Sequence, residues 1–188
     1  MNYKPNKFSK ILKTLFSPYA ILNYINSFFF KFKFKSCGRK FYAAFPLIVK
    51  NYQNIQIGNN FSSMGLTYLY ADQGKIIIGD NCSINSNVQI GASVGKIIIG
   101  SNVLIGPNVV LRAANHGLKK SNLMKMQPHS YGEIIIEDDV WIGSNAVITS
   151  GVKISNGSVI AAGAVVTKST DSYGIYAGVP AKKINERV

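Results

Sequence analysis

Hydrophobic positions recur every six residues along much of the chain. The aliphatic members of this series are Ile78, Ile84, Ile90, Ile99, Ile105, Leu111, Ile136, Ile142, Ile148, Ile154, Ile160 and Val166. The residue after each is usually small or acidic, and another small or apolar residue stands four positions later. A period of six does not match an α-helix, whose apolar face recurs at three, four and seven residues. It fits strands with a side-chain period of two, if the chain turns a corner once in every hexad.

Two segments nearly copy each other at a distance of 21 residues. They are Gly74–Ile90 (GKIIIGDNCSINSNVQI) and Gly95–Leu111 (GKIIIGSNVLIGPNVVL). Three hexads make one triangular coil of about 18 residues, so each repeat is one coil with about three residues inserted. The pattern predicts a parallel β-helix whose aliphatic side chains stack between coils and whose small residues allow tight corners. Periodicity does not give the handedness, since most parallel crossovers are right-handed.

The six-residue pattern stops between Leu111 and Ile136. The intervening residues 112–135 contain Asn, Gly, Pro and Lys together with both histidines of the chain, His116 and His129. A loop of this length inside a regular coil is usually functional, and catalytic groups often lie on loops held by a rigid scaffold. We therefore expect one long extruded loop, and we expect it to carry the chemistry.

Charge is distributed unevenly along a chain whose composition, 47% hydrophobic and 15% charged, is that of a globular protein. The net charge is +13, and residues 1–50 contain ten Lys or Arg and no acidic residue; the first carboxylate is Asp72. A basic head on a nearly neutral body indicates an anionic neighbour. No nucleic-acid-binding motif is present, so we expect no nucleic acid as partner.

The basic head also carries apolar residues at helical spacing. One helix face comprises Phe8, Ile11, Leu12, Leu15 and Tyr19. Ser17–Pro18 is expected to end this helix, and the apolar stretch Tyr19–Phe30 that follows is shorter than the ~20 residues needed to cross a bilayer. The arm either caps the open end of the first coil or holds the protein at anionic lipid. We divide the chain into a helical N-terminal segment, residues 1–50, and a β-helix domain, residues 51–188.

Cysteine and histidine usage argues against a metal centre. Cys37 and Cys82 stand far apart without metal-ligand spacing, which predicts free thiols in a cytoplasmic protein. Two histidines are fewer than the three that a zinc-dependent carbonic anhydrase built on such coils needs. Lys10 and Lys13 interrupt the N-terminal apolar stretch, so we predict no signal peptide. The expected location is cytoplasmic, with or without peripheral contact at the inner membrane face.

The segment Ile136–Thr167 (IEDDVWIGSNAVITSGVKISNGSVIAAGAVVT), followed by AGVPAK from Ala177, resembles the hexapeptide-repeat acyltransferases. Within that family it is most similar to the sugar O-acetyltransferases of galactoside, maltose and bacterial polysaccharide type. The resemblance covers about residues 54–184. It implies a left-handed β-helix, homotrimers, active sites between neighbouring subunits, and acetyl-CoA as donor without a metal.

The resemblance implies that His116 is the catalytic base. It lies in AANHG, 25 residues before Trp141, which is about where the family's base stands relative to its own VWIG motif. A neutral imidazole takes the proton from an acceptor hydroxyl as that oxygen attacks the thioester carbonyl. The alternative is a loop histidine that only hydrogen-bonds locally. His129, in QPHSYG, is expected as a loop or acceptor-site residue, and no carboxylate is obviously placed to orient His116.

The resemblance also implies a set of positions along the coenzyme. They are Trp141, Gly143, Ser144, Ala162, Thr167, Lys168 and Lys182. Trp141 either lines the pantetheine arm or caps a coil corner, and the two lysines suit the phosphates of the coenzyme. The family often has Arg where Lys182 stands. On the acceptor side we expect Asn115, together with Asn87 or Ser86.

The function that follows is transfer of an acetyl group to a sugar hydroxyl, in the biosynthesis of a surface polysaccharide such as capsule or O-antigen. The basic, aromatic N-terminus favours such an acceptor over a small free sugar. The alternatives are an acetyltransferase that acts on an amino sugar or a small xenobiotic, and a non-catalytic β-helix that serves as a scaffold.

Overall fold

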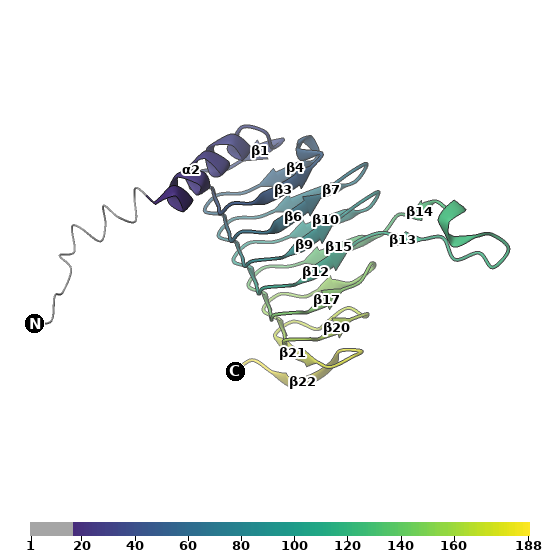
Figure 1. Cartoon of the computed structure of the whole chain (residues 1–188). Helices are drawn as coiled ribbons and strands as arrows, with labels where there is room; N and C mark the ends of the chain where they lie inside the picture. Colours follow the sequence, from purple (N-terminus) through teal and green to yellow (C-terminus); the bar gives the residue numbers. More distant parts are fainter. Residues whose placement is uncertain (1–16) are drawn as a thin grey trace, which may run out of the picture.

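Three parallel β-sheets form the faces of a triangular solenoid (Figure 1). The computed structural model describes residues 17–188. The first face contains β1 (Ser36–Cys37), β4 (Ile55–Ile57), β7 (Lys75–Ile78), β10 (Lys96–Ile99), β15 (Glu133–Ile136) and β18 (Lys153–Ile154). The second contains β2 (Tyr42–Ala43), β5 (Ser62–Ser63), β8 (Ser83–Ile84), β11 (Leu104–Ile105), β16 (Trp141–Ile142), β19 (Val159–Ile160), β21 (Gly174–Ala177) and β22 (Lys182–Glu186). The third contains β3 (Leu47–Lys50), β6 (Thr67–Tyr70), β9 (Gln89–Gly91), β12 (Val110–Arg112), β17 (Val147–Ile148) and β20 (Val165–Val166).

The chain visits the three faces in turn, so the six strands of the first face correspond to six coils of a left-handed β-helix. This confirms the predicted fold class. β22 runs antiparallel to β21 and ends the second face. Outside the coils lie the helix α2 (Pro18–Lys31), the short 3₁₀ turns η1 (Tyr52–Asn54) and η2 (Met124–Met126), and a hairpin of β13 (Asn115–His116) and β14 (His129–Ser130).

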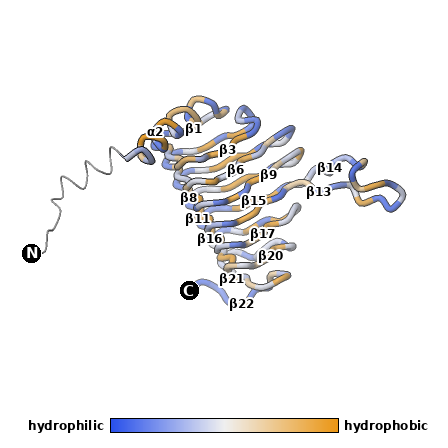
Figure 2. The backbone as a smooth tube through the Cα atoms, in the orientation of Figure 1, coloured by the Kyte–Doolittle hydropathy of each residue, from blue (hydrophilic) through white to orange (hydrophobic). Residues whose placement is uncertain are grey.

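The core is the stack of aliphatic side chains that the six-residue period predicted. In the first face Ile97 of β10 stands in register with Ile76 of β7 and Ile134 of β15, and all three are fully buried. Each such side chain contributes roughly 1.5–3 kcal/mol relative to an exposed one. Hydrophobic and hydrophilic stretches alternate along each coil (Figure 2).

The inserted residues of the longer coils lie at the corner between the third and first faces. Register repeats after 21 residues from Ile78 to Ile99, but after 18 from Ile136 to Ile154. The extra residues form extensions that stack closely: a Cβ on Gly74 would overlap the Gly95 carbonyl, and one on Gly95 would overlap that of Gly132. The long loop leaves the solenoid at this same tightly packed corner, between β12 and β15.

Ladders of asparagine side chains run along the other two corners. Each member has a positive φ, a conformation that Asn adopts more readily than most residues. The ladders are Asn60, Asn81 and Asn102 between the first and second faces, and Asn87, Asn108 and Asn145 between the second and third. In each ladder the amide donates to the next carbonyl oxygen at 2.9–3.1 Å. The ladders hold successive coils in register.

The solenoid begins at Ser36, earlier than the boundary at residue 51 expected from the hexads. β1, β2 and β3 pair in parallel with β4, β5 and β6, so residues 36–50 form the first coil. The hexad pattern missed this coil because its interior is filled largely by aromatic and small residues. Phe34, Phe41 and Phe61 pack in a row there, with ring centroids 5.7 and 5.5 Å apart, and close the end of the core.

Helix α2 starts where the sequence was expected to end a helix. Ser17 is its N-cap, with Oγ accepting from the backbone N–H of Ala20 at 3.1 Å, and Pro18 occupies the first turn. Serine before proline is a favourable helix start because the first-turn N–H groups lack partners in the helix. The predicted apolar face from Phe8 to Leu15 lies outside the described residues.

The buried side of α2 is polar, and its exposed side is apolar. Asn23, Asn26 and Ser27 are the buried residues of the helix. Asn26 Nδ2 donates to the Ala43 carbonyl at 2.9 Å, and Ser27 Oγ accepts from the Ala43 N–H at 2.9 Å. Asn23 Oδ1 accepts from the backbone N–H of Phe45 at 2.8 Å. These side chains supply the partners that β2, as an edge strand, would otherwise lack.

The contribution of the buried polar side of α2 to stability can be measured. Replacing Asn26 with leucine is expected to lower the free energy of unfolding by about 1–3 kcal/mol. The buried Ala43 carbonyl loses the shorter of its two side-chain hydrogen bonds and keeps only the one from Ser27 Oγ at 3.1 Å. Replacing the neighbouring exposed Ile25 with asparagine should change it by less than about 0.5 kcal/mol. The urea midpoints of the two variants measure the difference. Equal effects would show that the amide contributes nothing at this edge.

The two cysteines are free thiols, as expected. Burial raises the pKa of the Cys37 thiol to about 11, and burial also raises that of Cys82. Among residues 17–188, no helix is long and apolar enough to cross a membrane.

Candidate active site

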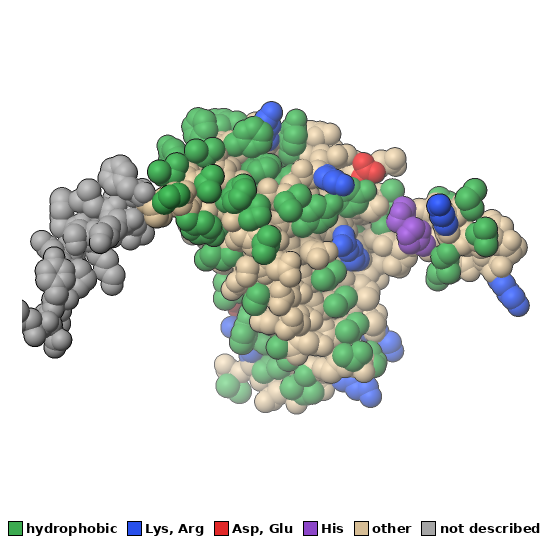
Figure 3. Space-filling model, in the orientation of Figure 1, with side chains coloured by type: hydrophobic (Ala, Val, Ile, Leu, Met, Phe, Trp, Pro, Cys, Tyr) green, Lys and Arg blue, Asp and Glu red, His purple; other side chains and the backbone are tan. Residues whose placement is uncertain are grey.

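Both histidines lie side by side on a hairpin that projects from the solenoid (Figures 1 and 3). β13 and β14 pair antiparallel, with His116 directly opposite His129 and Asn115 opposite Ser130. The imidazole ring centroids are 4.2 Å apart and the rings are inclined by 39°. Both side chains are exposed. The sequence placed the two histidines in one loop, but their direct pairing was not predicted.

The excursion is slightly shorter than expected. Arg112 belongs to β12 and Glu133 to β15, so the loop covers residues 113–132 rather than 112–135. Its base is anchored by Ser150, whose Oγ donates to the Ala113 carbonyl at 2.7 Å. Next to it, Lys96 and Glu133 form an ion pair at 3.0 Å. These contacts hold the base of the hairpin that carries the histidine pair against the solenoid.

The tip of the hairpin is ordered by one buried side chain. Gln127 Oε1 accepts from the Lys119 N–H at 2.7 Å, and its Nε2 donates to the carbonyls of Lys119 and Asn122 at 3.1 and 3.0 Å. A Cβ on Gly117 would lie 2.9 Å from the Cβ of Gln127, so the turn also needs glycine there. Sequence reasoning missed Gln127, since a single glutamine in a loop gives no signal of burial.

A second group of predicted residues lies on the solenoid itself. Trp141 is 55% exposed on β16, in register between Leu104 and Val159. Gly143 and Ser144 follow at the corner between the second and third faces. Ala162 lies at the same corner one coil later, and a Cβ on Gly143 would lie 2.6 Å from its backbone nitrogen. Glycine is therefore required for the close stacking at this corner.

The remaining predicted positions are scattered around these two groups. Thr167 and Lys168 are exposed at the end of β20, and Lys182 is exposed at the start of β22, opposite Ala177. Asn87 belongs to the corner ladder, where its amide donates to Asn108 at 2.9 Å. This structural role explains why asparagine stands at this position, with no need for contact with an acceptor substrate.

One chain does not bring the two groups together. β8, β11 and β16 run along one edge of the solenoid, whereas the hairpin of β13 and β14 leaves from the opposite side (Figure 2). The base candidate and the coenzyme candidates on β16 and its corner are therefore separated within the described chain.

The surroundings of the histidine pair are basic. Residues 113–132 contain Lys119, Lys120 and Lys125 and no acidic residue. Across residues 17–188, no group of three or more His, Cys, Asp or Glu side chains is placed to hold a metal ion. A positively charged loop suits an anionic ligand such as a nucleotide phosphate.

Comparison with known proteins finds a repeat model and solved structures to which this chain is similar. The family model of the hexapeptide repeat of succinyl-transferase matches residues 133–168. A solved galactoside acetyltransferase in complex with coenzyme A has 29% identity and a TM-score of 0.64, covering 95% of this chain and 78% of its own. The matched repeat lies within the coils of the solenoid, and the chain is similar in fold and sequence to solved acetyltransferases of this repeat type.

Two further solved structures are similar to this chain. A hexapeptide-repeat acetyltransferase of Vibrio cholerae, solved with acetyl-coenzyme A, shares 26% identity with a TM-score of 0.62, over 93% of this chain and 81% of its own. AntD, an N-acyltransferase from Bacillus cereus solved with dTDP and 3-hydroxybutyryl-CoA, superimposes with a TM-score of 0.75 over 89% and 90% of the two chains. Its identity of 23% shows a shared fold alone.

The similarity in sequence is strongest in a short stretch. The 2,3,4,5-tetrahydropyridine-2,6-dicarboxylate N-acetyltransferase of Staphylococcus aureus is 48% identical over 61 residues. These residues are 32% of this hexapeptide-repeat chain, which spans about a quarter (26%) of the length of that relative.

Proposed function

We propose that this hexapeptide-repeat protein transfers the acetyl group of acetyl-CoA to a sugar hydroxyl, with His116 as the general base. Two observations support the proposal. Related proteins of the same fold were solved with coenzyme A or acetyl-CoA. The loop that interrupts the coils carries both histidines on a hairpin anchored at its base. Of the two, the resemblance of the AANHG segment to hexapeptide-repeat acyltransferases implies His116 as the base.

In the proposed reaction acetyl-CoA supplies a thioester-bound acetyl group. One imidazole nitrogen of His116 accepts the proton of the acceptor hydroxyl, and the oxygen forms a bond to the thioester carbonyl carbon. The carbon–sulfur bond then breaks, and the proton passes to the departing thiolate. The products are an O-acetylated sugar and free coenzyme A, and no metal takes part.

The separation of the two groups favours an active site shared between subunits. A homotrimer would set the hairpin of one subunit beside the corner of Gly143, Ser144 and Ala162 of its neighbour. The exposed apolar tip of the hairpin and the exposed apolar residues near that corner give the two surfaces a matching chemistry. At the tip these are Leu118, Leu123, Met124 and Met126. On the second face they are Leu104 and Trp141, which line a hollow together with Met64.

Coenzyme binding is proposed along the same corner. Small residues there leave the backbone open to the pantetheine arm, as a narrow chain requires. Trp141 would lie against the arm, and Lys168 and Lys182, both exposed, would pair with phosphates. On the acceptor side Asn115, beside the histidine pair, is better placed than Asn87, whose amide is already engaged.

The proposed acceptor is a glycan of the cell surface, such as capsule or O-antigen, modified in the cytoplasm. Transfer to an amino sugar is the second candidate, favoured by the similarity to an N-acetyltransferase over 61 residues. A small xenobiotic with an amine or hydroxyl group could accept the acetyl group by the same reaction.

Incorporation of labelled acetyl from acetyl-CoA tests the function. The purified protein is offered surface glycans, free sugars and amino sugars, and the products are treated with mild base. Esters release the label under that treatment and amides keep it, which separates O- from N-transfer. We expect base-labile label in a glycan. Absence of transfer to every acceptor would favour the non-catalytic scaffold.

A further inference from the structure

Exposed apolar and aromatic side chains gather along the outward face of α2 (Figure 3). They are Ile21, Leu22, Tyr24, Ile25, Phe28, Phe29 and Phe32. Tyr24 is 72% exposed and Phe32 70%. The helix cannot roll over to bury this face, because Asn23, Asn26 and Ser27 bind β2 on the other side. An apolar surface held outward in this way marks an interaction site.

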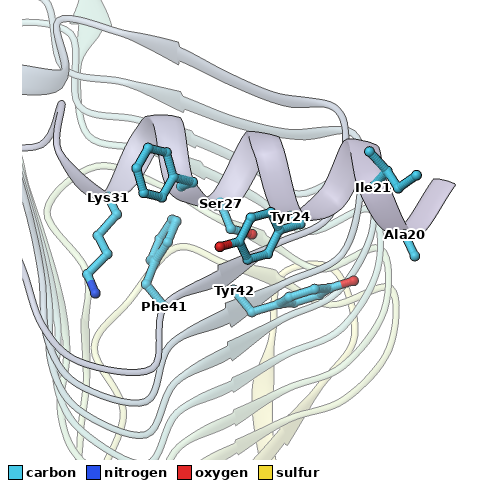
Figure 4. A pocket seen from close by; sticks show the side chains of 8 residues that line it. Ala20, Ile21, Tyr24, Ser27, Lys31, Phe41 and Tyr42 are labelled. Carbon is cyan, nitrogen blue, oxygen red and sulfur yellow. The ribbon is translucent and has the colours of Figure 1, made fainter. Parts of the chain in front are cut away.

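A groove runs between α2 and the first coil beneath this face (Figure 4). It has a volume of about 610 Å³ and is lined mainly by apolar side chains. The lining residues are Ala20, Ile21, Tyr24, Ser27, Phe28, Lys31, Phe41 and Tyr42. Lys31 lies at one end, so the groove combines an apolar length with one positive charge. An anionic lipid is complementary to this groove, because its acyl chain matches the apolar length and its phosphate matches the lysine.

The border of the apolar face is strongly basic. Lys31, Lys33, Lys35, Arg39 and Lys40 are all exposed. Lys33 Nζ lies 5.2 Å from the centre of the Phe29 ring, so cation and apolar surface are in direct contact. The sequence holds no acidic residue before Asp72, and residues 1–16 add four more lysines.

Charge decides which occupant fits. A second copy of this chain seated on α2 would bring an equally basic segment against the first, and like charges would oppose the contact. An anionic bilayer offers apolar depth and negative charge together, and each lysine near such a surface adds to its attraction. The 14-residue helix is about 21 Å long, which suits a helix lying in the interface.

We propose that α2 and its basic flank form a docking surface for an anionic lipid bilayer. The helix lies in the interfacial plane, with its aromatic face among the acyl chains and its lysines at the headgroup phosphates. The hairpin of β13 and β14 leaves the solenoid several coils away and stays free. This inference stands apart from the proposed chemistry, since docking requires neither His116 nor the coenzyme.

Flotation of the full-length protein with vesicles tests the proposal. The protein should float with vesicles of phosphatidylcholine and phosphatidylglycerol at low salt, and at least tenfold less with phosphatidylcholine alone or at high salt. The double variant F28S/F32S should bind at least tenfold more weakly, because each lost ring removes apolar burial. K31E/K33E/K35E should lose the preference for anionic vesicles.

The matched control is I184S/V188S, which removes two exposed apolar residues at the opposite end of the chain and should float like the parent. Hydrogen exchange should slow in residues 18–31 on vesicles. Failure of the parent to bind anionic vesicles at low salt would overturn the proposal. So would unchanged vesicle binding in F28S/F32S accompanied by a smaller assembly in light scattering, which would make the face a subunit contact. If the face docks on lipid, acetyl transfer to a soluble acceptor stays unchanged in F28S/F32S. If the face is a subunit contact, transfer falls together with the size of the assembly, so docking and chemistry are judged separately.

Discussion

Replacing His116 with alanine is expected to lower kcat by a factor of roughly 10²–10⁴, the usual loss when a positioned general base is removed. KM for acetyl-CoA should change little, because the coenzyme is proposed to bind along the solenoid corner. Folding should survive, since His116 is exposed on the hairpin and contributes nothing to the aliphatic core. Steady-state kinetics on the acceptor found by the labelling screen, with circular dichroism of the same preparation, measure both effects.

The matched control is His129→Ala, which removes the facing imidazole from the same hairpin. Its ring lies 4.2 Å from that of His116, so it tests whether the pair or one histidine carries the chemistry. We expect a smaller loss than for His116→Ala. A reversed order would assign the base to His129, and near-normal turnover without His116 would refute the assignment of a histidine base at this position.

Complementation between two inactive variants is the second large effect that we expect. His116→Ala removes the base from the hairpin, and Ala162→Trp fills the coenzyme corner from an exposed position. Each alone should lose about 10²-fold or more in activity, since a misplaced substrate is as damaging as a missing base. If sites form between subunits, a mixed trimer contains one interface with an intact hairpin facing an intact corner. Mixed trimers should therefore recover about a third of the parent activity.

Coexpression with two different affinity tags and purification through both isolates these mixed assemblies. Light scattering should give the mass of a trimer for the parent and for the mixture. Mixed trimers no more active than His116→Ala alone would place each site within one chain. A fully active monomer at micromolar concentration would remove the basis for shared sites.

The core of the fold could be predicted from the sequence because its physical cause is periodic. Every aliphatic side chain from Ile78 to Val166 in the hexad series is buried at a predicted strand position. The first coil escaped detection because Phe41 and small residues take the place of its aliphatic positions, with Phe34 and Phe61 packed on either side of the Phe41 ring. A sequence period reveals only contacts that recur from coil to coil. An end coil packs on one side against helix α2, not against another coil, so its residues depart from the period.

The candidate site was predictable in outline but not in geometry. The interruption of the coils identified the loop with His116 and His129, but the pairing of the rings depends on the hairpin register. Gln127 orders the hairpin through three hydrogen bonds to the backbone and Ser150 through one, and such isolated contacts leave no pattern in the sequence. The orientation of α2 was equally hidden, because a helix with polar residues inward has the same periodicity as one with polar residues outward.

The stacking of coils also fixes the axial distance between helix α2 and the histidine hairpin. Helix α2 packs on β2 in the first coil, and the hairpin leaves after β12 in the fourth. Neighbouring strands are about 4.8 Å apart, so the coil that carries the histidine hairpin stands roughly 14 Å along the axis from the coil that carries the helix. Side-chain substitutions cannot alter that height, because it is counted in whole turns of backbone. Only gain or loss of a complete coil changes it, in steps of about 4.8 Å. The axial distance between the histidine hairpin and any surface that binds the helix can therefore change only in whole-coil steps.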